Sequence, residues 1–340
     1  MSSSWEGRKI TGNETVLKVE NLKKWFPVRK GILASIFSSR QEYVRAVDGV
    51  SFDIKRGEIF GLAGESGCGK TTTGKVILRI IEPTDGKVYF KGTDIFSLPK
   101  KEMRKLRRKM QLIYQDPFES LNPRMTVYDL VRAPLKINRL VNDPEEEEEK
   151  VRKALEEVEL KPPETFFDKF PHELSGGQRQ RVAIARALVL QPEFIVADEP
   201  VSMLDVSIRA GILEIMLKLR DEYEISYLFI THDLALARHI CDRIAIMYLG
   251  KIVEIGKTDN IIGNPLHPYT KALLKAVPVP NPMGRRVEVL IRGFVPVSPT
   301  HVPSGCRFHP RCPHAMDICK REEPQLTRVE EDHYVACHLY

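Results

Sequence analysis

The sequence contains no long uninterrupted run of hydrophobic residues. The longest runs, such as 227–230 and 244–249, are about half a dozen residues long, whereas a helix needs roughly 18 or more apolar residues to cross a bilayer. The N-terminal residues, MSSSWEGRKITGNE, also lack the apolar core of a signal peptide. We therefore expect a chain that does not cross a membrane by itself and that stays in the cytosol.

The chain also lacks a strong excess of charge of either sign. Its 340 residues include 52 Lys and Arg against 46 Asp and Glu, and 42% of them are hydrophobic. This ordinary composition excludes disorder as the main state, and it excludes collagen-like and coiled-coil classes. The mild net charge of +6 gives no argument for a nucleic-acid partner. The length suggests two domains, or one domain with appendages.

Cysteine is scarce, and proline is unevenly spread. Four of the six cysteines lie near the C-terminus, at Cys306, Cys312, Cys319 and Cys337. Prolines punctuate the stretch before them, and proline neither continues a helix nor joins a central strand. We predict an irregular connection over 277–303 and a small cysteine-bearing module over 304–340, with a flexible N-terminus over 1–15.

Between these ends, short apolar runs alternate with helical patterns. The runs at 58–63, 194–197 and 227–230 have the length of buried strands. A helical pattern over 70–81 follows the first of them. Continuous apolar strands separated by helices are typical of a parallel sheet covered on both faces. The sequence therefore predicts an α/β fold.

A glycine-rich phosphate-binding motif follows the first run. It fits G-x-x-x-x-G-K-[ST] between a strand and a helix, the context that the motif requires. Its residues and the one after them are Gly64, Glu65, Ser66, Gly67, Cys68, Gly69, Lys70, Thr71 and Thr72. Glycines let backbone N–H groups converge on phosphate oxygens, and Lys70 and Thr71 are expected to reach the phosphates and Mg²⁺. We interpret Cys68 as a small filler residue, although a helix N-terminus can lower the pKa of a thiol.

Two acids end the second predicted strand. Asp198 and Glu199 follow the run FIVA. In such sheets a carboxylate at this place lies beside the phosphate loop, where Asp198 is expected to serve Mg²⁺. Glu199 is placed to polarise an attacking water as a general base.

A second glycine cluster, Leu174-Ser175-Gly176-Gly177-Gln178, begins another helix. Ser175 is a predicted N-cap, and Gln178 stands at the capping-box position. LSGGQ followed by QRVAIARAL, between a phosphate loop and VADEP, resembles the signature of ATP-binding cassette (ABC) ATPases. The resemblance implies an ABC ATPase domain over 16–276. This domain would consist of a RecA-like core, an antiparallel β subdomain, and a helical subdomain over about 116–175.

The resemblance also implies roles for single residues. Gln115 matches the Q-loop glutamine, a further partner of Mg²⁺ and water, and Asp205 matches the D-loop aspartate. His232 matches the switch histidine that contacts the γ-phosphate. Phe26 matches the aromatic residue that stacks on adenine, with Tyr43 as an alternative. In such cassettes two subunits bind ATP head to tail, and Ser175, Gly176, Gly177 and Gln178 would cover the nucleotide of the other subunit.

Further segments point to one branch of the family. IYQDPFESLNPRMTV, NPLHPYTKALLKAVP and the C-terminal tail resemble the oligopeptide/dipeptide importers, and GESGCGKTT resembles their F-type subunit. The resemblance implies a D-type ATPase partner, two membrane permeases, and indirectly an extracytoplasmic substrate-binding protein. It places the chain at the cytoplasmic face of the membrane and implies no nucleic acid.

The four C-terminal cysteines lack the close pairs that typical zinc modules show. Disulfides are disfavoured in a cytosolic chain. Four thiolates can hold a [4Fe–4S] cluster, and some importers of this branch carry one. We therefore expect a cluster on these cysteines, with Zn²⁺ or buried free thiols as alternatives.

Two other functions stay open on the sequence. Some relatives of this branch move oligosaccharides, and no ATPase residue distinguishes the two cargoes. A soluble ABC ATPase acting on nucleic acid or ribosomes is the alternative of another class. Such proteins usually carry two cassettes or a long coiled-coil insertion, and this chain has one cassette with only about 60 residues between Gln115 and Leu174.

Overall fold

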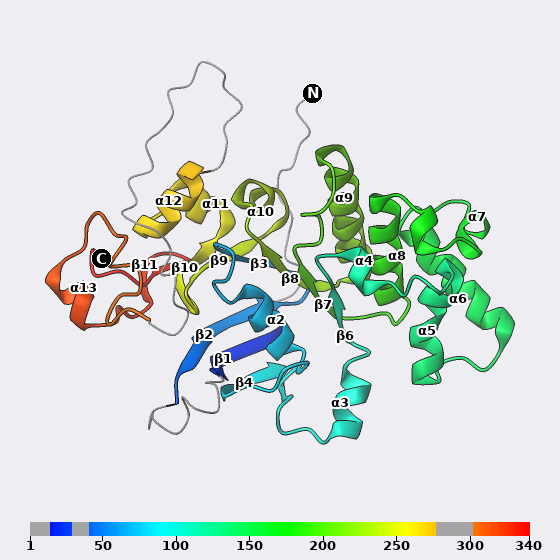
Figure 1. Ribbon diagram of the computed structural model, residues 1–340, viewed down its shortest axis with the longest axis horizontal. Helices are drawn as coiled ribbons and strands as arrows, with labels where there is room; N and C mark the ends of the chain where they lie inside the picture. Colours follow the sequence, from blue (N-terminus) through cyan, green and yellow to red (C-terminus); the bar gives the residue numbers. More distant parts are fainter. Residues whose placement is uncertain (1–13, 29–40, 277–301) are drawn as a thin grey trace, which may run out of the picture. The chain divides into compact units, whose positions relative to one another are not determined.

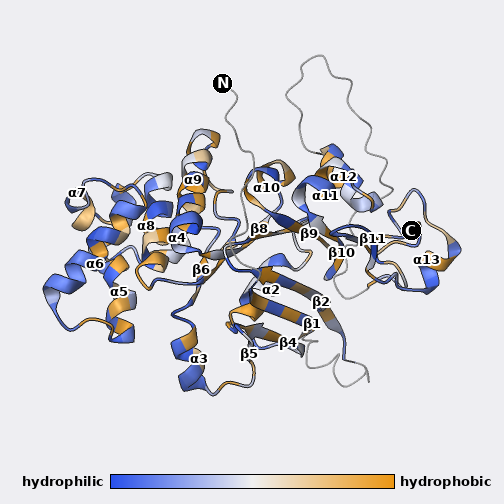
Figure 2. Cartoon of the chain, turned by 180° about the vertical axis from the view of Figure 1, so that it is seen from behind, coloured by the Kyte–Doolittle hydropathy of each residue, from blue (hydrophilic) through white to orange (hydrophobic). Residues whose placement is uncertain are grey.

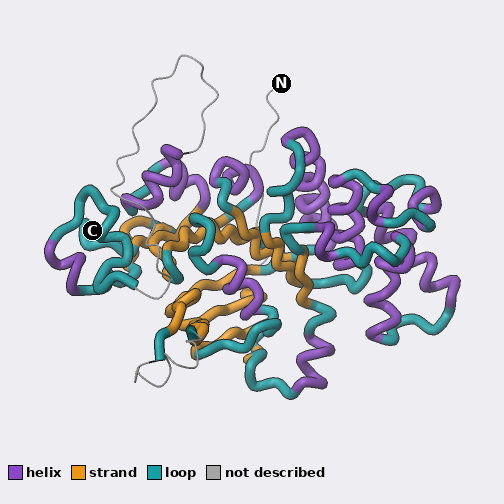
Figure 3. The backbone as a smooth tube through the Cα atoms, in the orientation of Figure 1, coloured by secondary structure: helices purple, strands orange, loops and turns teal. Residues whose placement is uncertain are grey.

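The computed structural model describes residues 14–28, 41–276 and 302–340, which form two compact units (Figure 1). Unit 1 contains the described residues up to Val16, a short piece at 54–59, and Leu98–Ile230. Unit 2 contains the described residues of 17–53, 60–97 and 231–340. Helices make up most of unit 1, whereas unit 2 holds most of the strands (Figure 3).

Unit 1 is built on parallel strands in the order β8-β7-β6. Their bounds are Met110–Ile113 for β6, Phe194–Asp198 for β7 and Ser226–Thr231 for β8. Every residue of β7 and β8 is buried, because continuous apolar strands need cover on both faces. The predicted strands at 194–197 and 227–230 are therefore confirmed, each lengthened by one or two residues.

Several helices of unit 1 begin at a residue whose side chain caps the first turn. Thr126 accepts a hydrogen bond from Asp129 N at the start of α5, and Asp143 accepts one from Glu145 N at the start of α6. Pro144 and three glutamates fill the first turn of α6, which suits the positive end of a helix. The bounds are α3 Lys100–Leu106, α4 Pro117–Ser120, α5 Val127–Asn138, α6 Pro144–Glu157, α7 Glu164–Phe167, the 3-10 helix Pro171–Glu173, α8 Gly176–Leu188 and α9 Val206–Tyr223.

Unit 2 contains an antiparallel sheet near the N-terminus, as the resemblance implies. Its strands lie in the order β2-β1-β4-β5, and β1 pairs with β4 so that Val19 faces Val88. Orange and blue residues alternate along β1 and β2 in Figure 2, which is the pattern of strands buried on one face. The bounds are β1 Thr15–Pro27, β2 Tyr43–Lys55, β4 Asp85–Phe90 and β5 Thr93–Asp94.

The second sheet of unit 2 joins distant parts of the sequence. Its order is β11-β12-β10-β9-β3, with β3 parallel to β9 and the other pairs antiparallel. The C-terminal strands therefore extend this sheet from the edge of β10. The bounds are β3 Ile59–Ala63, β9 Arg243–Tyr248, β10 Lys251–Lys257, β11 Thr327–Glu330 and β12 His333–Val335.

One predicted helix is shorter than expected. The helix predicted over 70–81 is α2, Lys70–Ile77, and it ends four residues early. Arg79 has a φ of 50°, in the left-handed region, which an α-helix cannot contain. The other helices of unit 2 are α10 Leu234–Ile240, α11 Thr258–Gly263, α12 Pro268–Ala276 and α13 Asp317–Arg321.

Within the described ranges, we find no helix with the length and apolar character of a membrane span. The expectations of a flexible N-terminus over 1–15 and of an irregular connection over 277–303 lie almost wholly outside the described residues.

Candidate functional site

The phosphate loop lies in unit 2, between the end of β3 and the start of α2. Gly69 caps α2 with a φ of 111°, and no side chain bonds the first turn as a cap. A Cβ on Gly69 would lie 2.0 Å from the carbonyl oxygen of Ala46, so only glycine fits this close approach. The loop thus presents the backbone of a helix N-terminus, which is an anion-binding arrangement.

Lys70 is folded back onto this loop. Its side-chain Nζ donates to the carbonyl oxygen of Gly64 at 2.7 Å and to that of Glu65 at 3.1 Å. Lys70 is only 5% exposed. A buried ammonium group needs such partners, and phosphate oxygens would offer it stronger, charge-assisted ones.

Cys68 is a buried residue of the same loop. Burial raises the pKa of its thiol above the usual range, against the lowering effect of Lys70. The neutral thiol is therefore favoured, which fits the interpretation of Cys68 as a filler residue rather than a reactive one.

In unit 1 the structure brings Gln115 and Glu199 together. Gln115 Nε2 donates to Glu199 Oε2 at 3.1 Å. Glu199 has a φ of 46°, and its backbone N–H donates to the carbonyl oxygen of Ile230 at the end of β8. Asp198 is buried at the last position of β7. An acid held in a left-handed conformation at a strand end is a costly arrangement that is common at functional sites.

The LSGGQ segment forms the predicted capping box at the start of α8. Ser175 Oγ accepts from Gln178 N at 3.3 Å, and Gln178 Oε1 accepts from Ser175 N at 3.0 Å. Helix packing also requires glycine at position 177, because an added Cβ would lie 2.5 Å from Cγ2 of Ile208 on α9. The residue types of this motif therefore serve helix packing as well as an exposed helix start, where Ser175 faces solvent.

Asp205 lies at the start of α9 in unit 1, without a side-chain cap bond. Its neighbours Met203 and Val206 are 62% and 79% exposed.

His232 belongs to unit 2, where it directly follows β8 and is exposed. The next residue, Asp233, caps α10 by accepting from Leu236 N at 3.1 Å. Among the predicted site residues, unit 2 therefore holds the phosphate loop and His232, whereas unit 1 holds Gln115, Asp198, Glu199, the LSGGQ segment and Asp205.

Phe26 and Tyr43, the two predicted adenine-stacking residues, are both in unit 2 and both exposed. The ammonium group of Lys24 lies 5.0 Å from the ring centre of Phe26. The ring of Tyr43 lies 6.3 Å from that of Trp25, which in turn stacks under the guanidinium group of Arg45. Phe26 thus presents a ring face to a cation and to solvent, while Tyr43 packs beside another aromatic residue.

The four C-terminal cysteines gather in one region. Burial is the main cause that raises the pKa of Cys306 to about 11; the nearby Cys319, Cys337 and Cys312 add to the rise, and a hydrogen bond with the backbone of Phe308 opposes it. All of them are free thiols. In the part of the chain that the structure describes, however, no three Cys, His, Asp or Glu side chains are placed to share a metal ion. The arrangement of the described thiols therefore does not fit a formed cluster or zinc site.

Sequence reasoning missed two contacts of the C-terminal region, one buried and one partly buried. His333 Nε2 lies 2.8 Å from Glu254 Oε1, and the backbone N–H groups of Leu266 and His267 donate to the same carboxylate. Arg311 contacts Glu65 of the phosphate loop. The members of each pair are far apart in sequence, and no local motif signals such contacts.

Known proteins confirm the class that this fold and these motifs define. A profile described as "ABC transporter" matches residues 47–202, and one described as "Oligopeptide/dipeptide transporter, C-terminal region" matches residues 253–319. The dimeric structure of the ATP-binding cassette MJ0796 bound to ADP and Pi superposes with a TM-score of 0.62 at 32% identity, covering 71% of this chain and 98% of that one. The chain thus has the fold of an ABC ATPase.

Two curated relatives extend the likeness over nearly the whole chain. The oligopeptide transport ATP-binding protein AppF of Bacillus subtilis is 47% identical over 330 residues, covering 96% of this chain and 98% of that protein. A putative peptide import ATP-binding protein of Brucella ovis is 50% identical over 305 residues, covering 90% and 95%. The chain belongs to the ABC transporter family of ATP-binding proteins, in the branch that carries the oligopeptide/dipeptide C-terminal region.

Proposed function

We propose that this ATPase energises the import of peptides across a membrane, as one of two cassette subunits docked on two permease proteins. The observation that carries the proposal is the pairing of an ABC cassette with an oligopeptide/dipeptide transporter C-terminal region in one chain. Relatives with names that specify oligopeptide transport or peptide import match over almost the full length. A D-type ATPase as the second cassette, a cytoplasmic location, and an extracytoplasmic binding protein that supplies the peptide are parts of this proposal.

In the proposed mechanism the phosphate loop binds the ATP phosphates. Lys70 would exchange its bonds to Gly64 and Glu65 for phosphate oxygens, while His232 would contact the γ-phosphate. The ring of Phe26, with Tyr43 as the alternative, would stack on adenine. In unit 1, Glu199 would take a proton from the attacking water, and Gln115 would hold its carboxylate in place.

Mg²⁺ would be held by oxygen atoms, which it prefers as ligands. The proposed ligands are the hydroxyl of Thr71, the carboxylate of Asp198 and the amide oxygen of Gln115, assigned from their motifs. Gln115 uses its amide nitrogen on Glu199, so its amide oxygen is the atom left for such a role. The ion would neutralise phosphate charge during transfer.

The signature segment would act on a second subunit. Ser175 is exposed at a helix start, and the neighbouring Asp205 segment presents Met203 and Val206 to solvent. These features suit a surface that covers the nucleotide bound by the partner cassette. The proposed division of the chain is a cassette over 16–276, its helical subdomain over 116–175, and the C-terminal region over 304–340.

The predicted [4Fe–4S] cluster stays a separate proposal. Its support is a set of four thiols in one region, and the described geometry, which holds no three placed ligands, speaks against it. Iron and acid-labile sulfide analysis of anaerobically purified protein tests it. About four irons per chain would establish the cluster, and one zinc per chain would favour the alternative. If the protein contains neither metal, the four cysteines are buried free thiols.

Co-purification tests the importer function. A tagged Glu199→Gln chain, solubilised gently with ATP present, would be examined by mass spectrometry for bound proteins. Two polytopic membrane proteins and a second cassette ATPase are the expected result. Ribosomal or DNA-repair proteins without a permease would contradict it and favour the soluble alternative.

A further inference from the structure

The C-terminal region contacts the phosphate loop through one arginine. Arg311 Nη1 donates to Glu65 Oε2 at 2.9 Å, and Arg311 Nη2 donates to Glu65 Oε1 at 3.0 Å. This is the parallel, two-bond geometry in which Arg–carboxylate pairs are strongest. The side chain of Arg311 is 8% exposed and that of Glu65 is 26% exposed, so the pair is mostly withdrawn from water.

Glu65 is also held through its backbone. Its N–H donates to the hydroxyl oxygen of Tyr269 at 2.8 Å. Its carbonyl oxygen accepts from Lys70 Nζ at 3.1 Å and from Cys68 N at 3.3 Å. The residue that Arg311 holds by its side chain is therefore also one whose carbonyl oxygen bonds the lysine of the phosphate loop.

An aromatic cluster fixes the segment that carries Arg311. Phe308 is 1% exposed and packs edge-on against Tyr248 with ring centres 5.3 Å apart. It also lies 5.4 Å from Tyr269, the residue that bonds Glu65. The guanidinium carbon of Arg311 lies 5.7 Å from the ring centre of Tyr248 and 5.8 Å from that of Phe308. The arginine is thus positioned by rigid, buried rings rather than by a loose loop.

Arg311 stays protonated, and therefore charged, at this site. Burial disfavours the charge, but the hydrogen bonds to Glu65 and Tyr248 outweigh burial, and together they raise the pKa of Arg311. If Arg311 were absent, the Glu65 carboxylate would stand without its counter-charge in a loop built to receive phosphates. Like charges at close range repel.

We propose that Arg311 is a positioning residue for the phosphate loop: it neutralises Glu65 and fixes it, and through Glu65 it sets the place of Lys70 for ATP. The inference deepens the proposed function, since it rests on 64–72 being the ATP phosphate site. On this view the C-terminal region is a structural part of the nucleotide site, and displacement of that region lowers the affinity for ATP.

The test compares ATP binding and turnover among arginine variants. Arg311→Ala should raise the Kd for ATP about tenfold, an effect of about 1.4 kcal/mol, and should leave kcat at saturating ATP within about threefold of wild type. Arg311→Lys should give an intermediate Kd, because an ammonium group cannot make both parallel bonds. In Arg311→Ala/Glu65→Gln, part of the affinity should return, because the unpaired carboxylate is gone.

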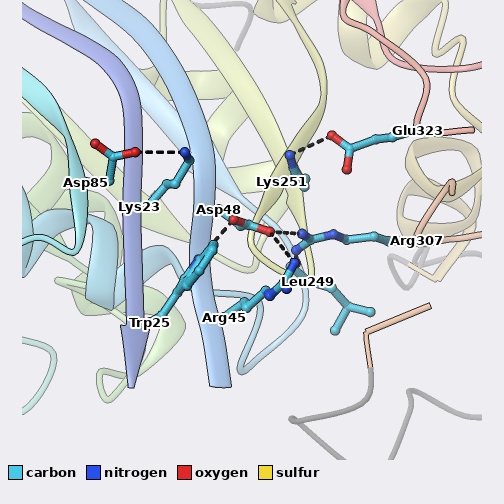
Figure 4. Close-up of polar contacts among 9 residues, drawn as sticks. All are labelled: Lys23, Trp25, Arg45, Asp48, Asp85, Leu249, Lys251, Arg307 and Glu323. Atoms are coloured by element: carbon cyan, nitrogen blue, oxygen red, sulfur yellow. Dashed lines mark hydrogen bonds and ion pairs between the residues drawn. The ribbon is translucent and has the colours of Figure 1, made fainter. Parts of the chain in front are cut away.

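Arg307 provides a matched control in the same segment. Its side chain is 5% exposed, close to that of Arg311, but it bonds Asp48 and the carbonyl oxygen of Leu249 instead of the phosphate loop (Figure 4). Asp48 also accepts from Trp25 Nε1 at 2.9 Å. Arg307→Ala should lower thermal stability at least as much as Arg311→Ala, yet leave the Kd for ATP within about twofold.

Lys70→Ala separates failure of this inference from failure of the phosphate site. An unchanged Kd in Arg311→Ala, with binding lost in Lys70→Ala, would overturn the inference and leave the site intact. Equal weakening in Arg307→Ala and Arg311→Ala would also overturn it, because general destabilisation would then explain both. Normal ATP binding by Lys70→Ala would overturn the phosphate site itself.

Discussion

Two glycine-rich helix starts in this chain look alike in sequence and differ in structure. At the start of α2, Gly69 stands at the cap position in a left-handed conformation, and no side chain bonds the first turn as a cap. At the start of α8, Ser175 and Gln178 bond each other's backbone reciprocally. The start of α2 therefore depends on close backbone contacts that only glycine permits, whereas the start of α8 is capped by side chains of its own segment.

This difference in capping indicates how each helix N-terminus would bind the phosphate groups of a nucleotide. An uncapped start with a curled loop and a buried lysine is prepared to hold phosphates within its own chain. A self-capped start is stable without a ligand, and it suits a surface that meets a nucleotide only when a second subunit delivers it. We therefore expect changes in the phosphate loop to alter binding, and changes in unit 1 to alter turnover or stability.

The largest expected effect is that of Glu199→Gln. Loss of a general base should slow ATP hydrolysis by ~10²–10⁴-fold, while the Kd for ATP stays within about threefold because the phosphate loop is intact. Steady-state phosphate release and equilibrium ATP binding provide the measurement. Glu193→Gln is the matched control, since Glu193 directly precedes β7 and Glu199 directly follows it. Near-normal turnover in Glu199→Gln would refute the assignment of the base.

A smaller effect is expected from Gln115→Ala. Its removal breaks the hydrogen bond to the Glu199 carboxylate, and bonds to charged groups contribute about 1.5–3 kcal/mol, or roughly 10- to 150-fold in rate. The control is Gln111→Ala on β6, because the side chain of Gln111 donates to the carbonyl oxygen of Arg107 rather than to a carboxylate. The expectation concerns kcat; a change confined to the Kd for ATP would show that Gln115 acts on binding instead.

Gly177→Ala tests whether the second glycine cluster serves packing. The new Cβ would meet Ile208, so the free energy of unfolding should fall by about 1–3 kcal/mol. Gly176→Ala should cost much less, because its Cβ would lie 3.4 Å from Leu204, an ordinary contact. Denaturant unfolding of both variants gives the comparison. Equal stability of the two would contradict the packing role of Gly177.

The smallest effect concerns the adenine ring. If Phe26 stacks on it, Phe26→Ala should raise the Kd for ATP by about 2- to 12-fold, the worth of an aromatic pair of about 0.5–1.5 kcal/mol. Tyr43→Ala should then leave the Kd unchanged. The same comparison with GTP shows whether the effect depends on the base. The reverse ranking of the two variants would assign the stacking role to Tyr43.

The sequence predicts local features of this molecule well. The strands at 194–197 and 227–230, the capping box of Ser175 and the phosphate loop are each encoded within a few neighbouring residues. The end of α2 was harder to place, because the left-handed conformation of Arg79 leaves no sign in a pattern of apolar residues.

Contacts between distant residues were not predictable in this way. Arg311 and Glu65 are separated by 246 positions, and Arg307 and Asp48 by 259. The C-terminal cysteines are a different case: their composition predicts a metal site, and among the described residues no three Cys, His, Asp or Glu side chains are placed to share a metal ion. Residue types indicate which chemistry is available, whereas tertiary packing decides which groups meet.

The difference between the two helix starts is tested most directly by ATP binding to dilute, monomeric protein. Titration calorimetry would compare wild type with Lys70→Ala and Ser175→Ala. We expect the Kd for ATP to rise about 10- to 150-fold in Lys70→Ala, because a hydrogen-bond partner that carries a charge is lost, and to stay within about twofold of wild type in Ser175→Ala. Similar losses in the two variants, or a larger loss in Ser175→Ala, would contradict this expectation.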